Sequence, residues 1–133
     1  MTNNSILDQI GNTPLVEALH IIKNPNIRLF LKLEGNNPGG SVKDRPAYNM
    51  IKSALERGDI NKETKLIEAT SGNTGIALAM IAGVFGLNIE LVMPENSTKE
   101  RVQTMRAYGA KVTLTSSDVG MEVSRDYSEN KVN

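Results

Sequence analysis

The sequence predicts an α/β protein built on a parallel β-sheet, in the order strand, helix, strand, helix, strand. Three short apolar runs have the composition of buried strands, at residues 65–69, 88–93 and 111–115. Helical patterns at residues 73–85 and 98–108 fill the two intervals between them. Since parallel strands need crossover connections, and these are almost always right-handed, the alternation predicts a parallel three-layer βαβαβ unit.

The two helices of this unit differ in character. Residues 73–85 are apolar nearly all round, which is typical of a buried helix, whereas residues 98–108 are amphipathic. Ser97 and Glu100 have the spacing of a capping box at the start of the second helix. Gly109 fits the position just after its end.

Two further elements are predicted upstream. Alternating apolar residues at 27–33 predict a strand, and residues 47–57 predict a helix that Gly58 closes. Proline is favoured at the first helical position and disruptive deeper inside, so this helix is expected to begin at Pro46. Lys43 would then lie on the turn before the helix, near its positive end.

Composition excludes several classes of protein. The 15 basic and 15 acidic side chains cancel, which gives no electrostatic attraction for nucleic acid or an anionic membrane. The absence of cysteine and the presence of a single histidine argue against disulfides, thiolate nucleophiles and a metal site. The polar start is unlike a signal peptide, and the most apolar stretch, 76–85, is too short to span a bilayer. We therefore expect a soluble cytoplasmic protein.

The first motif whose residues could take part in a reaction is the Gly- and Pro-rich run at residues 36–46, which contains Lys43. A neutral lysine amine attacks aldehydes to form a Schiff base, and a nearby helix N-terminus disfavours the charged form. Gly39 and Gly40 would let the backbone approach a flat ligand closely. From spacing alone, a plain surface turn with Ser41 as a cap and Lys43 in solvent remains the simpler interpretation.

The second motif, Thr-Ser-Gly-Asn-Thr-Gly at residues 70–75, ends a predicted strand and opens a predicted helix. Open α/β sheets bind ligands at this position, where free N–H groups and the helix dipole suit a carboxylate or phosphate. Thr70, Ser71, Thr74 and Asn73 add side-chain donors. The glycine spacing matches neither a P-loop nor the dinucleotide fingerprint. The alternative is that Ser71 or Asn73 only caps the helix.

The remaining charged candidates give weaker signals. His20 lies in an apolar neighbourhood and is expected to be structural. Asp44 and Arg45 directly follow Lys43 and are expected to be solvated rather than paired across the turn. The carboxylates show no close pairing of the kind that hydrolases use.

In combination, these motifs resemble cysteine synthase, the O-acetylserine sulfhydrylase group of the fold-type-II pyridoxal-phosphate enzymes, in a form similar to the B isozyme. The resemblance runs from about Ile6 to Asp126, is highly specific as a set, and outweighs the simpler interpretations of both motifs. It rests on residues 10–16, 32–38, 41–45, 68–77, 93–95, 105–110 and 120–122.

The resemblance implies a role for each motif residue. Lys43 would hold pyridoxal 5'-phosphate as a Schiff base and then act as base on the α-proton of the substrate. Asn73 would hydrogen-bond the ring hydroxyl of the cofactor, and Thr70, Ser71 and Thr74 would hold the substrate carboxylate. The implied reaction is β-replacement, in which sulfide or another sulfur donor displaces acetate from O-acetyl-L-serine to give L-cysteine.

The resemblance also implies limits. Family members are much longer, and their later half supplies the loop that grips the cofactor phosphate, so the chain is expected to be an amino-terminal portion. Residues 1–40 would be an arm of the larger domain and residues 41–133 the smaller α/β subdomain. We expect this chain alone to bind the cofactor poorly and turn over little, and the full-length family to form homodimers.

Two other hypotheses remain open at this point. One is a catalytically inactive α/β binding module or an incomplete fragment. The other is a different fold-type-II enzyme, such as a serine/threonine dehydratase or cystathionine β-synthase.

Overall fold

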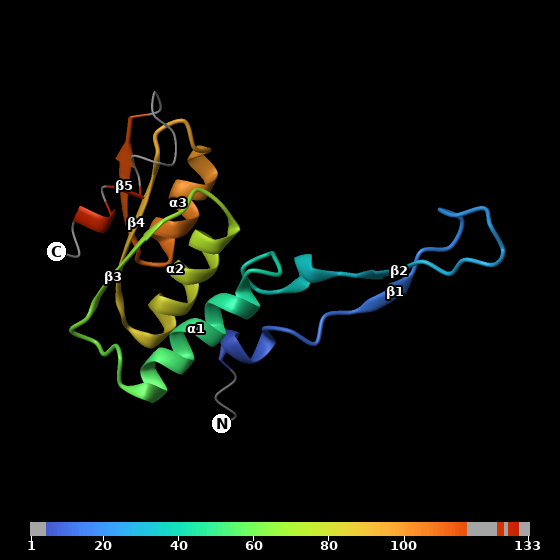
Figure 1. The fold of residues 1–133 in the computed structure, drawn as a ribbon, viewed down its shortest axis with the longest axis horizontal. Coiled ribbons are helices and arrows are strands. Elements are labelled where there is room, and N and C mark those ends of the chain that lie inside the picture. The colour runs from blue at the N-terminus through green and yellow to red at the C-terminus, as the bar shows by residue number, and fades with distance from the viewer. Residues whose placement is uncertain (1–4, 117–124, 127, 131–133) are drawn as a thin grey trace.

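The computed structural model describes residues 5–116, 125–126 and 128–130. Within them, a three-stranded parallel sheet has the order β3-β4-β5, and a separate two-stranded ribbon pairs β1 with β2. Figure 1 shows helices packed on one face of the parallel sheet and the ribbon projecting away from this body as an arm. The α/β class and the parallel sheet predicted from the sequence are confirmed.

The helices and strands keep the predicted order. The predicted bounds of β3, α2 and β5 are those observed, while β4 extends one residue further than predicted, to Pro94. In chain order the elements are η1 (Ile6–Gln9), β1 (Leu15–Glu17), β2 (Phe30–Lys32), η2 (Glu34–Asn36), α1 (Asp44–Arg57), β3 (Lys65–Ala69), α2 (Asn73–Phe85), β4 (Asn88–Pro94), α3 (Lys99–Ala107) and β5 (Lys111–Thr115).

Strand β4 is the centre of the parallel sheet and is buried over all but its first residue. Its neighbours β3 and β5 are the edges of the sheet and are partly exposed. Helix α2 connects β3 to β4, and α3 connects β4 to β5. Right-handed crossovers in this order place both helices on the same face, as Figure 1 shows.

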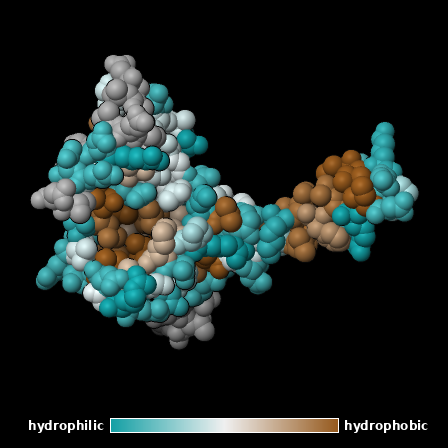
Figure 2. Space-filling model, viewed as in Figure 1, coloured by the Kyte–Doolittle hydropathy of each residue, from teal (hydrophilic) through white to brown (hydrophobic). Residues whose placement is uncertain are grey.

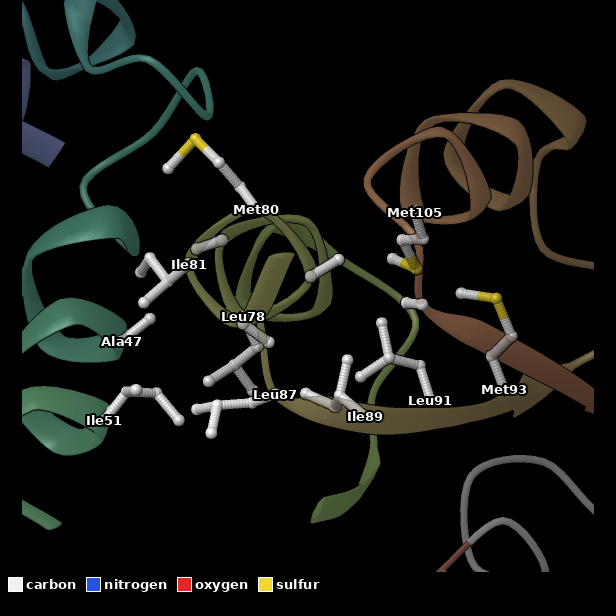
Figure 3. Packing of buried hydrophobic residues seen from close by; sticks show 14 of the residues in the cluster. Ala47, Ile51, Leu78, Met80, Ile81, Leu87, Ile89, Leu91, Met93 and Met105 are labelled. Atoms are coloured by element: carbon white, nitrogen blue, oxygen red, sulfur yellow. The ribbon is translucent and has the colours of Figure 1, made fainter. Parts of the chain in front are cut away.

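Helix α2 lies at the middle of the hydrophobic core, as its apolar sequence predicts. Residues 77–82 are all between 0% and 7% exposed. In Figure 3, Ile81 points toward α1, where Ala47 and Ile51 lie, and Leu78 points toward Leu87, just before β4. Because α2 is held between α1 and the sheet, its first turn has a fixed position relative to both.

Two helix starts differ from the prediction. Helix α1 begins at Asp44 rather than Pro46, because Lys43 already has near-helical dihedral angles (φ −68°, ψ −17°). Pro46 is tolerated there because N–H groups in the first turn have no intrahelical acceptor. The predicted capping box of α3 is also wrong: the N-cap is Thr98, without a side-chain cap bond. Three residues further on stands Arg101, which cannot accept a hydrogen bond.

The predicted helix ends are confirmed. Gly58 and Gly109 both take the left-handed backbone conformation that closes a helix, with φ of +76° and +94°. The strand predicted at residues 27–33 is shorter, since β2 covers only Phe30–Lys32. The matching segment at 120–122 lies outside the described residues.

The arm consists of β1, β2 and the loop between them. Its strands pair antiparallel, with Val16 opposite Leu31, and every residue of both strands is exposed. Figure 2 shows apolar side chains gathered on the arm. An isolated two-stranded ribbon is at best marginally stable in water, so an apolar arm of this kind is suited to packing against further protein. Its exposed apolar residues are Leu15, Val16, Leu19, Ile21, Ile22, Ile27, Phe30 and Leu31.

Within the described part of the chain, no helix has both the length and the apolar character needed to cross a bilayer.

Candidate functional site

Lys43 is the N-cap residue of α1, and its side chain is exposed. Its backbone N–H donates to the Ser41 hydroxyl at 3.1 Å, and its carbonyl accepts from the N–H of Ala47 at 3.1 Å. Ser41 itself is only 8% exposed. The Lys43 backbone is therefore held on both sides, while its amine is free to meet a ligand.

The expectation of solvated side chains is wrong for Asp44, while the Arg45 side chain is 39% exposed and, as expected, does not pair with Asp44 across the turn. The Asp44 side chain is fully buried and accepts a hydrogen bond from the Gly39 N–H at 2.5 Å. Arg45 instead pairs with Glu34, through Nε and one terminal nitrogen, each 2.8 Å from a carboxylate oxygen. The physical reason is that the loop before α1 folds back over the first turn of the helix and covers Asp44.

The Glu34–Arg45 pair belongs to a network that joins three segments distant in sequence. The Thr13 hydroxyl donates to Glu34 at 2.5 Å and accepts from Arg45 at 3.2 Å. Asn37 donates to Glu34 at 2.9 Å and accepts from the Gly11 N–H at 2.8 Å. The network thus ties the base of the arm to the loop that carries Lys43. Sequence reasoning placed all three segments in the family pattern but assigned this network no role.

The network predicts a pH-dependent contribution of Glu34 to stability. Hydrogen bonds from Arg45 and then Thr13 lower the pKa of Glu34 from 4.5 to about 2. A lowered carboxyl pKa means that the contribution is present above pH 4.5 and is lost as the pH falls from 4.5 toward about 2. In thermal unfolding scans from pH 7 to pH 2, we expect Glu34→Gln to have a lower midpoint than the parent at pH 7 and a shrinking difference below pH 4.5.

Glu56→Gln is the matched control, because Glu56 is 63% exposed and makes only a surface pair with Lys52 at 3.7 Å. We expect little change from it at any pH. A midpoint difference for Glu34→Gln that stays constant across the acid range would contradict the assigned role of the network.

The second motif forms the turn between β3 and α2. Thr70 is 8% exposed, and its backbone N–H continues the sheet by donating to the Val92 carbonyl at 2.9 Å. Gly72 is the N-cap of α2, and Asn73 is its first residue. Asn73 is exposed, and Ser71 and Thr74 are partly buried. The turn therefore combines hydroxyl and amide donors with the N–H groups of a helix start, a combination that suits an anion.

Close packing fixes this turn from behind. A β-carbon on Gly75 would lie 2.7 Å from the Thr70 methyl group and 2.8 Å from the Met105 terminal methyl group. Arg101 of α3 also donates to the Ser71 carbonyl at 3.3 Å. The absence of a side chain at position 75 thus lets Thr70 seat its methyl group against the first turn of α2.

The two motifs lie on the same side of the body. Helices α1 and α2 pack against each other, and Figure 1 shows both of them beginning on the side that faces the arm. The starts of the two helices, with Lys43 as the N-cap of α1 and Asn73 as the first residue of α2, therefore lie on this side. His20 lies in the loop of the arm, is exposed, and takes a left-handed conformation with φ of +69°.

The donor groups at these two helix starts suit a carbonyl and acidic groups. An amine at Lys43 suits an aldehyde, and the amide of Asn73 suits a phenolic oxygen. The hydroxyls of Thr70, Ser71 and Thr74 suit a carboxylate. These are the groups that pyridoxal phosphate and an amino acid present.

The chain belongs to the pyridoxal-phosphate-dependent enzyme family, whose model matches residues 6–132. Its relatives include cysteine synthase B of Pseudomonas syringae pv. syringae, 55% identical over 125 residues, a match that covers 94% of this chain and 74% of that protein. Cysteine synthase B of Escherichia coli (strain K12) is 54% identical over 123 residues, which are 92% of this chain and 41% of that one.

Solved structures agree with the fold. Cysteine synthase from Entamoeba histolytica superposes with a TM-score of 0.92 at 38% identity, over 99% of this chain and 40% of that one. A hydrogen sulfide-producing enzyme from Fusobacterium nucleatum superposes with a TM-score of 0.88 at 49% identity. The match covers 97% of this chain and 43% of that one. The fold-type-II assignment is confirmed. The chain spans about two fifths of the length of the E. coli relative and of both of these structures.

Proposed function

We propose that this chain acts in cysteine biosynthesis, as the lysine-bearing part of a pyridoxal-phosphate-dependent β-replacement enzyme. The reaction converts O-acetyl-L-serine and sulfide, or another sulfur donor, to L-cysteine and acetate. The observation that carries the proposal is the position of Lys43 at the start of α1. Its side chain is exposed, while hydrogen bonds hold its backbone in place. The cysteine synthases among its relatives support the choice of reaction within the family.

Lys43 would have two tasks in this reaction. Its amine would hold the cofactor aldehyde, and once released it would take the proton from the α-carbon of the substrate. The cofactor, when bound, supplies an electron sink for the charge left on that carbon. Asn73 would orient the cofactor by donating from its side-chain amide to the ring hydroxyl.

The turn at residues 70–74 would hold the substrate by its carboxylate. Thr70, Ser71 and Thr74 offer hydroxyl groups there, and the first turn of α2 offers N–H groups and the positive end of its dipole. The packing of Gly75 against Thr70 supports this role, because it limits the positions that the Thr70 hydroxyl can take.

The same proposal assigns the parts of the chain to domains. Residues 1–40 would be an arm of the larger domain, and residues 41–133 the smaller α/β subdomain. The projecting apolar arm supports this division, because the larger domain would cover it. We also propose that the loop for the cofactor phosphate lies outside these 133 residues, and that the whole enzyme is a homodimer. The chain alone would then bind the cofactor weakly and turn over little.

The test is to assemble this chain with the part of E. coli cysteine synthase B that follows the matched region, and to supply cofactor, O-acetyl-L-serine and sulfide. We expect the assembled pair to form L-cysteine roughly a hundredfold faster than either part alone, because only the pair encloses the reacting groups. A pair that co-elutes but makes no cysteine would contradict the proposal. Stabilisation by a small carboxylate without a visible absorption band would instead favour an inactive binding module.

A further inference from the structure

Asp44 is a buried acid that the proposed reaction does not use. Its side chain has no exposed surface, although Val42 is 46% exposed and Lys43 is exposed. Carboxylates are rarely buried unless they are paired with a cation. Of the two cations next to it in sequence, Arg45 makes its ion pair with Glu34 and Lys43 is exposed. The burial of Asp44 therefore needs another explanation.

The Asp44 carboxylate closes the loop that carries Lys43. One oxygen, Oδ2, accepts from the Gly39 N–H at 2.5 Å, across five residues. Other hydrogen bonds in this loop span only two or three residues. They include Gly40 N–H to the Asn37 carbonyl at 2.8 Å, Lys43 N–H to the Ser41 hydroxyl at 3.1 Å and Asp44 N–H to the Ser41 carbonyl at 3.4 Å. Among the described residues, the Asp44 side chain thus bonds residue 39 directly to the first turn of α1, beside the indirect link from Arg45 through Glu34 to Asn37.

Position 39 has no room for a side chain next to the Asp44 carboxylate. A β-carbon at this position would press against Oδ1 of Asp44 and lie 2.9 Å from both Cγ and Oδ2. The carboxylate therefore occupies the space that a side chain at residue 39 would need. Gly39 and Asp44 form a matched pair, in which each residue depends on the identity of the other.

Burial of the Asp44 carboxylate is destabilising in one respect, so a contribution to stability does not by itself account for it. Oδ1 of Asp44 is buried and has no hydrogen-bond partner among the described residues. Burial raises the pKa of Asp44, against the opposing effect of the Gly39 N–H, and the charge of Glu34 raises it further. A buried oxygen without a hydrogen-bond partner is destabilising, and departures of this kind are found mostly at functional sites.

We propose that Asp44 is a positioning residue for Lys43. By holding the Gly39 N–H, it closes the loop at residues 39–44 and fixes the direction in which the Lys43 side chain leaves the backbone. The inference rests on the proposed function, because the direction of Lys43 matters only if its amine holds the cofactor. A plain helix-dipole role for Asp44 would need neither its burial nor its bond to Gly39.

The test uses the chain without cofactor and two readouts. Amide hydrogen exchange by NMR reports the Gly39 bond, and the rate of reductive methylation of Lys43 relative to Lys52 reports the freedom of the Lys43 amine. In Asp44→Ala we expect exchange at residue 39 to become about tenfold faster and Lys43 to be methylated faster. Asp44→Asn keeps an acceptor and should preserve most of the protection.

Glu100→Gln is the control for a helix-dipole effect, because Glu100 is an exposed acid in the first turn of α3. It should change neither readout. A folded Asp44→Ala chain with unchanged exchange at residue 39 or unchanged Lys43 methylation would overturn the proposal.

If Asp44→Ala does not fold, Gly39→Ala tests the proposal in its place, because the new methyl group displaces the Asp44 carboxylate without removing it. Its expected result is the same gain in exchange and methylation, and no gain would overturn the proposal. Failure of both variants to fold would also overturn it, since the pair would then serve the whole fold. Neither readout involves cofactor or substrate, so a failure of the proposed reaction would remain separate from a failure of this inference.

Discussion

Replacing Lys43 by alanine is expected to abolish covalent capture of pyridoxal phosphate at this site. When the parent chain is mixed with the cofactor and reduced with borohydride, the trapped adduct should be found on the peptide that contains Lys43. Alanine cannot form a bond to an aldehyde, so the same peptide of the variant should carry none. In the assembled enzyme, we expect cysteine formation to fall by about 10²–10⁴-fold, the usual contribution of a positioned base.

Lys52→Ala is the control for nonspecific labelling of surface amines. Lys52 is an exposed lysine on the same helix, paired with Glu56 at 3.7 Å on the solvent side. Its loss should leave both the adduct at Lys43 and the rate of cysteine formation unchanged. If Lys43 and Lys52 are labelled equally in the parent, and Lys43→Ala keeps its activity, the assignment of Lys43 to the cofactor site is wrong.

Replacing Gly75 by alanine is expected to damage the carboxylate site and the fold together. The new methyl group would overlap the Thr70 methyl group and the fully buried end of Met105. Overpacking of this kind typically costs about 1–3 kcal/mol. Thr70 would also have to turn, which moves the hydroxyl assigned to the substrate. Chemical denaturation measures the first effect, and the KM for O-acetyl-L-serine in the assembled enzyme measures the second.

Gly72→Ala is the matched control in the same motif. A β-carbon on Gly72 would meet nothing within 4 Å, and its backbone is extended with φ of −131° and ψ of −151°, which alanine adopts without strain. We expect little change in stability from it. If Gly72→Ala and Gly75→Ala destabilise equally, or if Gly75→Ala leaves KM unchanged, the proposed coupling between Gly75 and Thr70 is wrong.

The regular elements were predictable because their signals are local. The apolar run at residues 73–85 and the β-branched run at 111–115 each carry their own periodicity, and both have the predicted bounds. Helix starts were less predictable, because the rules for Pro46 and Ser97 allow several neighbouring residues to begin the helix. The position at which the chain first turns depends on contacts outside the motif, such as the loop that folds over Asp44.

The residues of the candidate site could be predicted from the sequence, but the contacts that hold them in place could not. The sequence indicates Lys43 and the turn at residues 70–75 because glycine, proline and hydroxyl residues gather there. It does not reveal that Glu34 pairs with Arg45 or that Asp44 is buried. These contacts depend on how segments fold over one another, and the pair from Thr13 to Arg45 spans 32 residues.

The arm has a consequence for biosynthesis of the chain. Residues 15–32 leave the ribosome before any strand of the parallel sheet has been made, so under the proposed domain division their apolar side chains would be uncovered at that time. A two-stranded ribbon with two open edges can template pairing with a neighbouring nascent chain during that interval. Glu17, Arg28 and Lys32 place charges among these apolar residues, and the Glu17–Arg28 pair at 2.8 Å lies on the arm itself. Charges placed in this way act as gatekeepers, which keep an exposed apolar segment from aggregating.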